Sequence, residues 1–221
     1  IVPEAAEDSS DARLTWLGVR AIGQRSTEDA GTIKYWADFG MVRGRERLYE
    51  FDDADTGRRL LTERSKRDVR GHAFDIGLSW QTPLKWRPAF TAAYAQGSGD
   101  DGSGTDSSYR QTGLHNNKAR FFGVNRFRFY GELLRPELSN LSVSTLAVGL
   151  PFFERSSVEL VHHRYRQVKA ADSMRDINVD ADLTGSSRDI GSEIDVIFGF
   201  RDPLRWDFAV VASRFTAGDA Y

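Results

Sequence analysis

The chain has 221 residues, enough for one large β domain or two small domains, and its net charge of −2 gives no bulk basicity for binding nucleic acid. It has no cysteine, which excludes disulfides, thiol catalysis and cysteine metal sites. No stretch approaches the roughly 20 apolar residues of a membrane helix. A charged fraction of 28% is typical of a soluble protein. Transmembrane barrels are equally polar on average, because their apolar residues alternate with polar ones.

Segments in which apolar and polar residues alternate recur along the chain and predict β-strands, whereas helical periodicity is hard to find. In chain order the expected strands are 14–24, 31–44, 72–81, 88–97, 138–151, 156–168, 192–201 and 206–217. The first three and the seventh alternate cleanly. The other four have the composition of strands but leave the facing of their side chains open.

The connections between these strands sort by length. Four are short: 25–30, 83–86, 152–155 and 202–205. Three are long and polar: 45–70, 98–137 and 169–190. Because short and long connections alternate, all short turns fall at one end of an up-and-down antiparallel sheet. This layout is typical of an outer-membrane β-barrel, and a soluble sandwich would not be expected to sort its loops in this way.

Aromatic residues gather beside the short turns, at Trp80, Trp86, Phe152, Phe153 and Trp206. Such rings are enriched where a barrel meets the membrane interface, since they have an apolar body and a polar edge. Aromatic residues are also common in any β protein, so this observation favours a barrel only in combination with the loop pattern.

The alternation predicts that one face of each clean strand is apolar and meets lipid, and that the other face borders water. The predicted inward cations are Arg20, Lys34, Arg120, Arg126, Arg128, Arg201 and Arg214. The predicted inward acids are Asp38, Asp75, Glu132, Glu159 and Asp195. Guanidinium groups in a channel would attract an anion, particularly a carboxylate, and neighbouring acids would hold the arginines and keep binding weak. The wet face of any half-exposed sheet carries similar residues.

Other kinds of site are poorly supported. Asp100, Asp101 and Asp106 could gather around a calcium ion, but their spacing matches no defined loop and also fits a disordered acidic tip. His162 and His163 are adjacent in a predicted strand, so they should point to opposite faces and cannot chelate one ion. No catalytic motif such as GxSxG or HExxH occurs. We therefore expect neither enzymatic activity nor a cofactor.

Several longer stretches resemble one known family. "SSYRQTGLHNNKARFFGVNRFRFYGELLRPELSNL" (107–141), "SSVELVHHRYRQ" (156–167) and "DLTGSSRDIGSEIDV" (182–196) are similar to the C-terminal half of the alginate-export outer-membrane proteins, as are 35–44 and 87–100. The resemblance implies a barrel of about 18 strands in the outer membrane of Gram-negative cells. It also implies passive export of alginate, a polymer of mannuronate and guluronate, delivered by periplasmic secretion proteins.

The same resemblance implies an electropositive lumen in which arginines form a constriction and acidic neighbours pair with them. Arg120, Arg126, Arg128 and Arg214 lie in segments that match the family and are its candidate lumen contacts in this chain.

The chain departs from the family in length. The interior of a closed barrel of about eight strands is nearly filled by side chains, which is too narrow for a polymer. The chain also starts without a signal sequence and ends at "FTAGDAY". We therefore expect residues 1–221 to form a single domain that is part of a larger barrel. A general or anion-selective porin, a soluble ligand-binding β-barrel and an outer-membrane hydrolase remain alternatives.

Overall fold

The computed structural model describes residues 10–53, 59–100, 102, 104–111, 118–175, 177–179, 182–201 and 206–221. The eight long strands are β1 (Ser10–Thr27), β2 (Gly31–Asp53), β3 (Arg59–Gln81), β4 (Ala89–Gly97), β8 (Leu141–Phe152), β9 (Ser156–Gln167), β10 (Asp189–Arg201) and β11 (Asp207–Ala217). Three short strands are β5 (Thr105–Asp106), β6 (Lys118–Ala119) and β7 (Phe127–Arg128). No helix long and apolar enough to cross a membrane is found in the described part of the chain.

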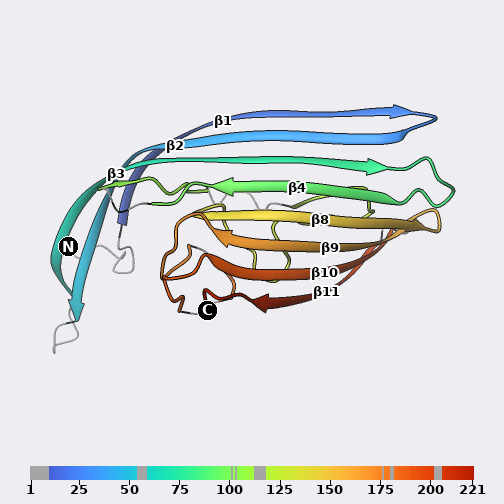
Figure 1. Cartoon of the computed structure of the whole chain (residues 1–221). Helices are drawn as coiled ribbons and strands as arrows, with labels where there is room; N and C mark the ends of the chain where they lie inside the picture. The colour runs from blue at the N-terminus through green and yellow to red at the C-terminus, as the bar shows by residue number, and fades with distance from the viewer. Residues whose placement is uncertain are drawn as a thin grey trace.

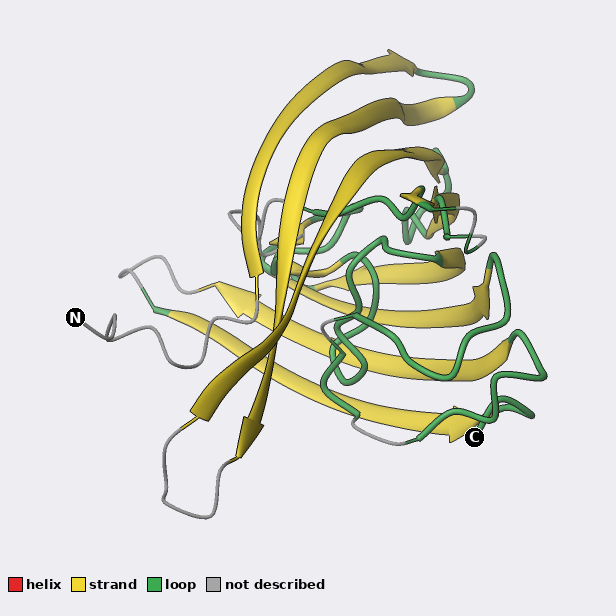
Figure 2. Ribbon diagram, turned by 90° about the vertical axis from the view of Figure 1, so that its left-hand side faces the viewer, coloured by secondary structure: helices red, strands yellow, loops and turns green. Residues whose placement is uncertain are grey.

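The eight long strands form one antiparallel sheet in the order β1-β2-β3-β4-β8-β9-β10-β11, so each pairs with the next long strand along the chain. β1 and β11 are the two edges. Figure 2 shows that the sheet curves strongly and that the longest loops lie on its concave side. The predicted all-β, up-and-down architecture is therefore confirmed. Seven of the eight expected strands begin within four residues of their predicted starts, whereas β3 begins at Arg59, 13 residues before the predicted start at residue 72.

The short connections lie together at one end of the sheet (Figure 1), as the loop lengths predicted. Three residues separate β1 from β2 and β8 from β9, and seven separate β3 from β4. The predicted turn 202–205 lies outside the described residues. Three aromatic side chains at this end are largely exposed: Trp86 at 72%, Phe153 at 86% and Trp206 at 76%. Their position agrees with an aromatic girdle.

The prediction that 45–70 is a loop was wrong. β2 and β3 continue to pair through most of this stretch, with Arg45 opposite Asp68 and Glu46 opposite Arg67. The resulting hairpin projects beyond the rest of the sheet (Figure 2). Among the side chains that the structure describes, both strands of this hairpin have charged residues, including Arg45, Arg47, Lys66 and Asp68. Backbone hydrogen bonds and cross-strand ion pairs, such as Arg45–Asp68 at 3.2 Å, support it.

The convex face is apolar and has no second layer of protein on it in the described part of the chain. Tyr35, Phe39, Ile76 and Leu78 are 46–51% exposed on this face. The strands with ambiguous facing follow the same rule: in β8, Leu146 and Val148 are exposed while their neighbours are buried. The packed core lies on the concave side instead. There the wall residues of β4, β8, β9 and β10 meet side chains of the connection between β4 and β8.

Candidate lumen site

One segment of the chain folds over the concave face and forms most of the candidate site. We call residues 118–140 the inward segment. Phe121, Phe127, Tyr130, Leu134 and Leu138 of this segment are each at most 9% exposed and pack on the wall. These apolar side chains thus fix the segment to the concave face of the sheet, and its exposed side chains point away from the wall.

Carboxylates of β10 hold the middle of the inward segment. Glu193 is fully buried and accepts the backbone N–H groups of Leu133, at 2.7 Å, and Leu134, at 2.9 Å. Asp195 accepts the N–H of Glu132 at 3.3 Å. These bonds satisfy backbone donors that would otherwise be buried without a partner. Because they bind main-chain groups, they fix the path of the segment without using its side chains.

Residues of other strands hold the start of the inward segment in the same way. Glu159 of β9 accepts the N–H of Gly123 at 3.3 Å, and the hydroxyl of Ser157 accepts that of Val124 at 2.9 Å. Lys34 of β2 donates to the carbonyl of Phe121 at 2.9 Å. Wall groups from three separate strands therefore position one loop.

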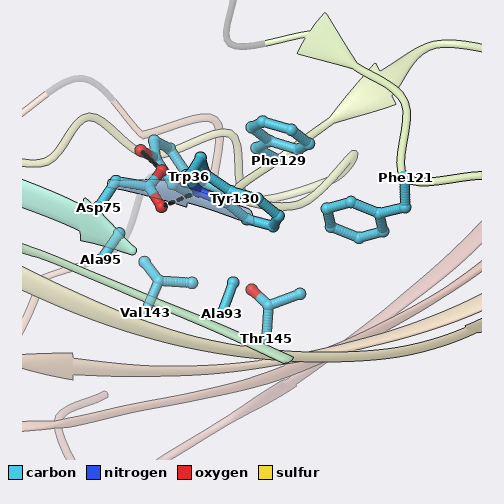
Figure 3. Close-up of a pocket in the computed structure, with 9 residues that line it drawn as sticks. All are labelled: Trp36, Asp75, Ala93, Ala95, Phe121, Phe129, Tyr130, Val143 and Thr145. Carbon is cyan, nitrogen blue, oxygen red and sulfur yellow. Dashed lines mark hydrogen bonds between the residues drawn. The ribbon is translucent and has the colours of Figure 1, made fainter. Parts of the chain in front are cut away.

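An aromatic cluster joins the inward segment to β2 and β3 (Figure 3). Asp75 accepts hydrogen bonds from the indole of Trp36 and from the hydroxyl of Tyr130, both at 2.7 Å. The Trp36 ring stacks on Phe129, with ring centroids 5.9 Å apart and planes at 7°. The Trp36 ring also covers Gly77, where an added Cβ would lie 2.0 Å from it. The cavity among these residues measures about 10 Å³, which is room for about one water molecule and not for a ligand.

Six of the seven predicted inward cations fall into two groups, and the seventh, Arg214, is described below. Four take part in contacts with the protein itself. Arg20 makes two hydrogen bonds to Asp38, at 2.9 and 2.7 Å. Lys34 binds the inward segment as described, and Arg128 lies 3.8 Å from the Glu132 carboxylate. Arg201 lies at the short-turn end, where it pairs with Asp207 at 2.9 Å and donates to the carbonyl of Val124 at 3.2 Å.

Arg120 and Arg126 form the second group. Both are exposed on the inward segment, and neither side chain has an ion-pair partner within the described residues. Arg135 is exposed on the same segment and donates from Nε to the carbonyl of Glu132 at 2.7 Å, which leaves the rest of its guanidinium group available. Arg135 was not among the predicted residues, although it lies in the stretch that resembles the family.

The facing predicted for Arg214 is corrected by the strand register. Arg214 of β11 lies opposite Ile194 of β10, and Ser213 lies opposite Asp195. Directly opposed residues of neighbouring strands share a face. Since Asp195 is buried on the concave side and Ile194 is 46% exposed on the convex side, Arg214 is on the convex face. The alternation in 206–217 is too weak to show this in the sequence.

The predicted inward acids have two kinds of partner. Asp38 and Glu132 are near predicted arginines, as expected, whereas Asp75, Glu159 and Asp195 bind the inward segment or the wall. Glu193, which accepts hydrogen bonds from two backbone N–H groups of the inward segment, was not among the predicted acids. It stands two residues before Asp195 in a cleanly alternating strand, and that spacing could have identified it.

The two described acidic residues of the 97–108 stretch pair with arginines of the protein. Asp100 lies 3.0 Å from Arg67, and Asp106 binds Arg110, which is buried and also binds Glu46 at 2.6 Å. Asp101 lies outside the described residues. No group of three potential metal ligands is present among the residues that the structure describes.

The adjacent histidines point to opposite faces, as predicted. His162 is exposed on the convex face, whereas His163 is fully buried on the concave side. There the Nδ1 of His163 lies 2.8 Å from the hydroxyl of Thr145. They cannot act together on one ion.

A curved up-and-down sheet with an apolar convex face, and with a loop folded over its concave face, is the wall of a porin-type β-barrel. A sequence model described as "Alginate export" matches residues 4–221. The chain belongs to the alginate export family, and the resemblance stated above is confirmed.

Three relatives have the name "Alginate production protein AlgE". That of Pseudomonas aeruginosa is 31% identical over 188 residues, covering 84% of this chain and 37% of the relative. That of Pseudomonas syringae pv. tomato is 23% identical over 206 residues, covering 86% and 40%. That of Azotobacter vinelandii is 32% identical over 138 residues, covering 59% and 28%. The chain thus spans less than half the length of these relatives.

Proposed function

We propose that this chain forms part of the wall of a larger outer-membrane barrel through which alginate leaves the cell by passive diffusion. No bond is made or broken. The polymer carries one carboxylate on each sugar residue, and these groups would step between guanidinium groups on the concave side. The periplasmic proteins that would deliver the polymer belong to the same proposal.

The observation that carries this proposal is the pair of exposed arginines on the inward segment. Arg120 and Arg126 are attached to a loop that wall carboxylates hold in place, so their charges remain on the concave side. A guanidinium group binds carboxylate through a planar fork of donors. In an aqueous channel each such contact is weak, which allows release as well as binding.

Arg135, Arg128 and Arg20 extend the same basic path in our proposal. Arg20 and Arg128 have acidic partners, and these partners orient the guanidinium groups while reducing their net attraction for the polymer. Lys34 and Arg201 bind carbonyl groups of the inward segment, so we assign them to its support rather than to the polymer.

The test uses the full-length protein that contains this chain, reconstituted in planar bilayers. We expect anion-selective conductance that mannuronate oligomers reduce. Replacing Arg120→Glu or Arg126→Glu should lower the ratio of anion to cation permeability. At ~10 Å in water a unit charge contributes about 0.4 kcal/mol, so reversing one charge should change the local anion concentration about fourfold.

A matched control is Arg25→Glu. Arg25 is exposed and lies opposite Ile33, on the face away from the inward segment. This variant should keep the selectivity of the unaltered protein. If the oligomers have no effect on conductance, the protein is a general anion channel and the alginate assignment fails. If both inward variants keep full selectivity, Arg120 and Arg126 do not border the conducting path.

A further inference from the structure

The convex face of β9 and β11 has a group of basic residues that the proposed function does not use. We call His162, Arg164, Arg166 and Arg214 the outer basic cluster. His162 and Arg214 both lie opposite Ile194, on either side of β10. Arg164 and Arg166 follow His162 at intervals of two residues, so they share its face. All four are exposed.

The facing of this cluster follows from the residues between its members. His163 and Tyr165 alternate with the cluster along β9 and are fully buried on the concave side. The cluster therefore points away from the channel. It cannot contact a polymer that passes on the concave side.

An apolar band lies directly beside the cluster, toward the short turns. Leu160 is 51% exposed, Val196 is 42% exposed and Val210 is 48% exposed on the same face. Along β9 the outward residues thus change from apolar to basic at His162. A surface that is apolar toward the short turns and cationic toward the long loops matches an amphiphile with acyl chains and an anionic head group.

The same change occurs on β2 and β3. Phe39 is exposed at 46%, and four residues further along β2 is Arg43, which lies directly opposite Arg70 of β3. Like charges directly opposite each other destabilise a sheet. Neither guanidinium group has an ion-pair partner in the described part of the chain, so both are available to an external anion.

We infer that the outer basic cluster, together with Arg43 and Arg70, binds the phosphate groups of lipids in the leaflet at the long-loop end of the strands. The acyl chains of those lipids lie on the apolar band. This inference rests on the proposed insertion into a membrane, but not on the identity of the exported molecule. Each basic residue near an anionic surface contributes a modest attraction, and several together anchor the wall at a fixed depth.

Arg166 and Arg214 are the most informative residues to change. Arg164 binds Asp189 within the protein, so its replacement would also disturb the connection before β10. Arg166 and Arg214 have no such side-chain partner among the described residues. A double variant, Arg166→Gln with Arg214→Gln, removes two charges and leaves the described ion pairs intact.

The experiment measures binding of dioleoylphosphatidic acid to the full-length protein in a nonionic detergent, by native mass spectrometry. We expect the double variant to bind this lipid about 25-fold more weakly, which is about fivefold for each arginine removed. Binding of dioleoylphosphatidylcholine should be weaker in the unaltered protein and change little in the variant. The matched control is Arg120→Gln with Arg126→Gln, which removes the same charge from the inward segment and should leave binding of phosphatidic acid unchanged.

Equal binding of phosphatidic acid by the unaltered protein and the double variant would overturn the inference. So would an equal loss in the control variant, because the effect would then follow net charge and not position. Inorganic phosphate alone should not compete at concentrations similar to those of the lipid. Effective competition would show a site for free phosphate instead. The circular dichroism of each variant reports its folding, and its conductance separates this test from that of the proposed function.

Discussion

Glu193 offers the most direct test of how the inward segment is held. One of its oxygens accepts the N–H of Leu133 at 2.7 Å, and the other accepts the N–H of Leu134 at 2.9 Å. Replacing Glu193→Gln keeps the shape of the side chain but turns one oxygen into an NH₂ group. Whichever way the amide is oriented, one backbone N–H then faces a donor.

The expected cost follows from the strength of these bonds. A hydrogen bond to a charged group contributes about 1.5–3 kcal/mol, and a neutral one about 0.5–1.5 kcal/mol. Losing one bond and weakening the other should make local opening easier by about 3 kcal/mol. Since each 1.4 kcal/mol is a factor of ten, the amides of Leu133 and Leu134 should exchange with solvent about 100-fold faster.

Hydrogen exchange followed by mass spectrometry measures this change in peptides that cover residues 131–138. Asp38→Asn is the matched control, because Asp38 is also a wall acid but binds Arg20 and not the inward segment. The control should leave exchange in these peptides unaltered. An increase of less than about threefold in Glu193→Gln would refute the argument that this carboxylate holds the segment.

Two further outcomes follow from the structure. Gly77→Ala should displace the Trp36 ring and weaken its hydrogen bond to Asp75. The variant should be about 1–3 kcal/mol less stable, and the Trp36 fluorescence should shift to the red. An unshifted spectrum would contradict this prediction. Burial would raise the pKa of Asp106, but hydrogen bonds from Arg110 and from backbone outweigh it and hold the pKa below its usual 3.8. The contact with Arg110 should therefore stabilise the loop above about pH 3.8 and be lost as the pH falls further. Hydrogen exchange in residues 105–110, corrected for its intrinsic pH dependence, should rise between pH 6 and pH 3, and Asp106→Asn should remove that rise.

The strands could be predicted from the sequence because a wall between an apolar and a polar environment imposes a period of two. Tyr35 and Phe39 show this clearly, since their outward facing follows directly from the alternation with Lys34 and Asp38. The signal fails where that contrast ends. In 45–70 the sequence is rich in charged residues and has no clean alternation, so a paired strand and a wet loop have the same composition.

The path of the inward segment could not be predicted for a different reason. Its position depends on pairs far apart in the sequence, such as Leu133 with Glu193, and no local pattern encodes them. The sequence placed Arg120, Arg126 and Arg128 together as lumen cations. In the structure Arg120 and Arg126 are exposed, whereas Arg128 lies 3.8 Å from the Glu132 carboxylate. Whether an arginine is exposed or paired depends on neighbours such as Glu132, which only the folded chain brings within reach.

The way in which the wall holds the inward segment has a consequence for substitutions in it. Glu193, Asp195 and Glu159 grip peptide groups, which every residue except proline can offer in the same form. Substitution of Arg120 or Arg126, whose side chains take no part in these bonds, should therefore leave the path of the inward segment unchanged. Under the proposed function, single substitutions at these arginines would change selectivity and leave the support of the inward segment intact.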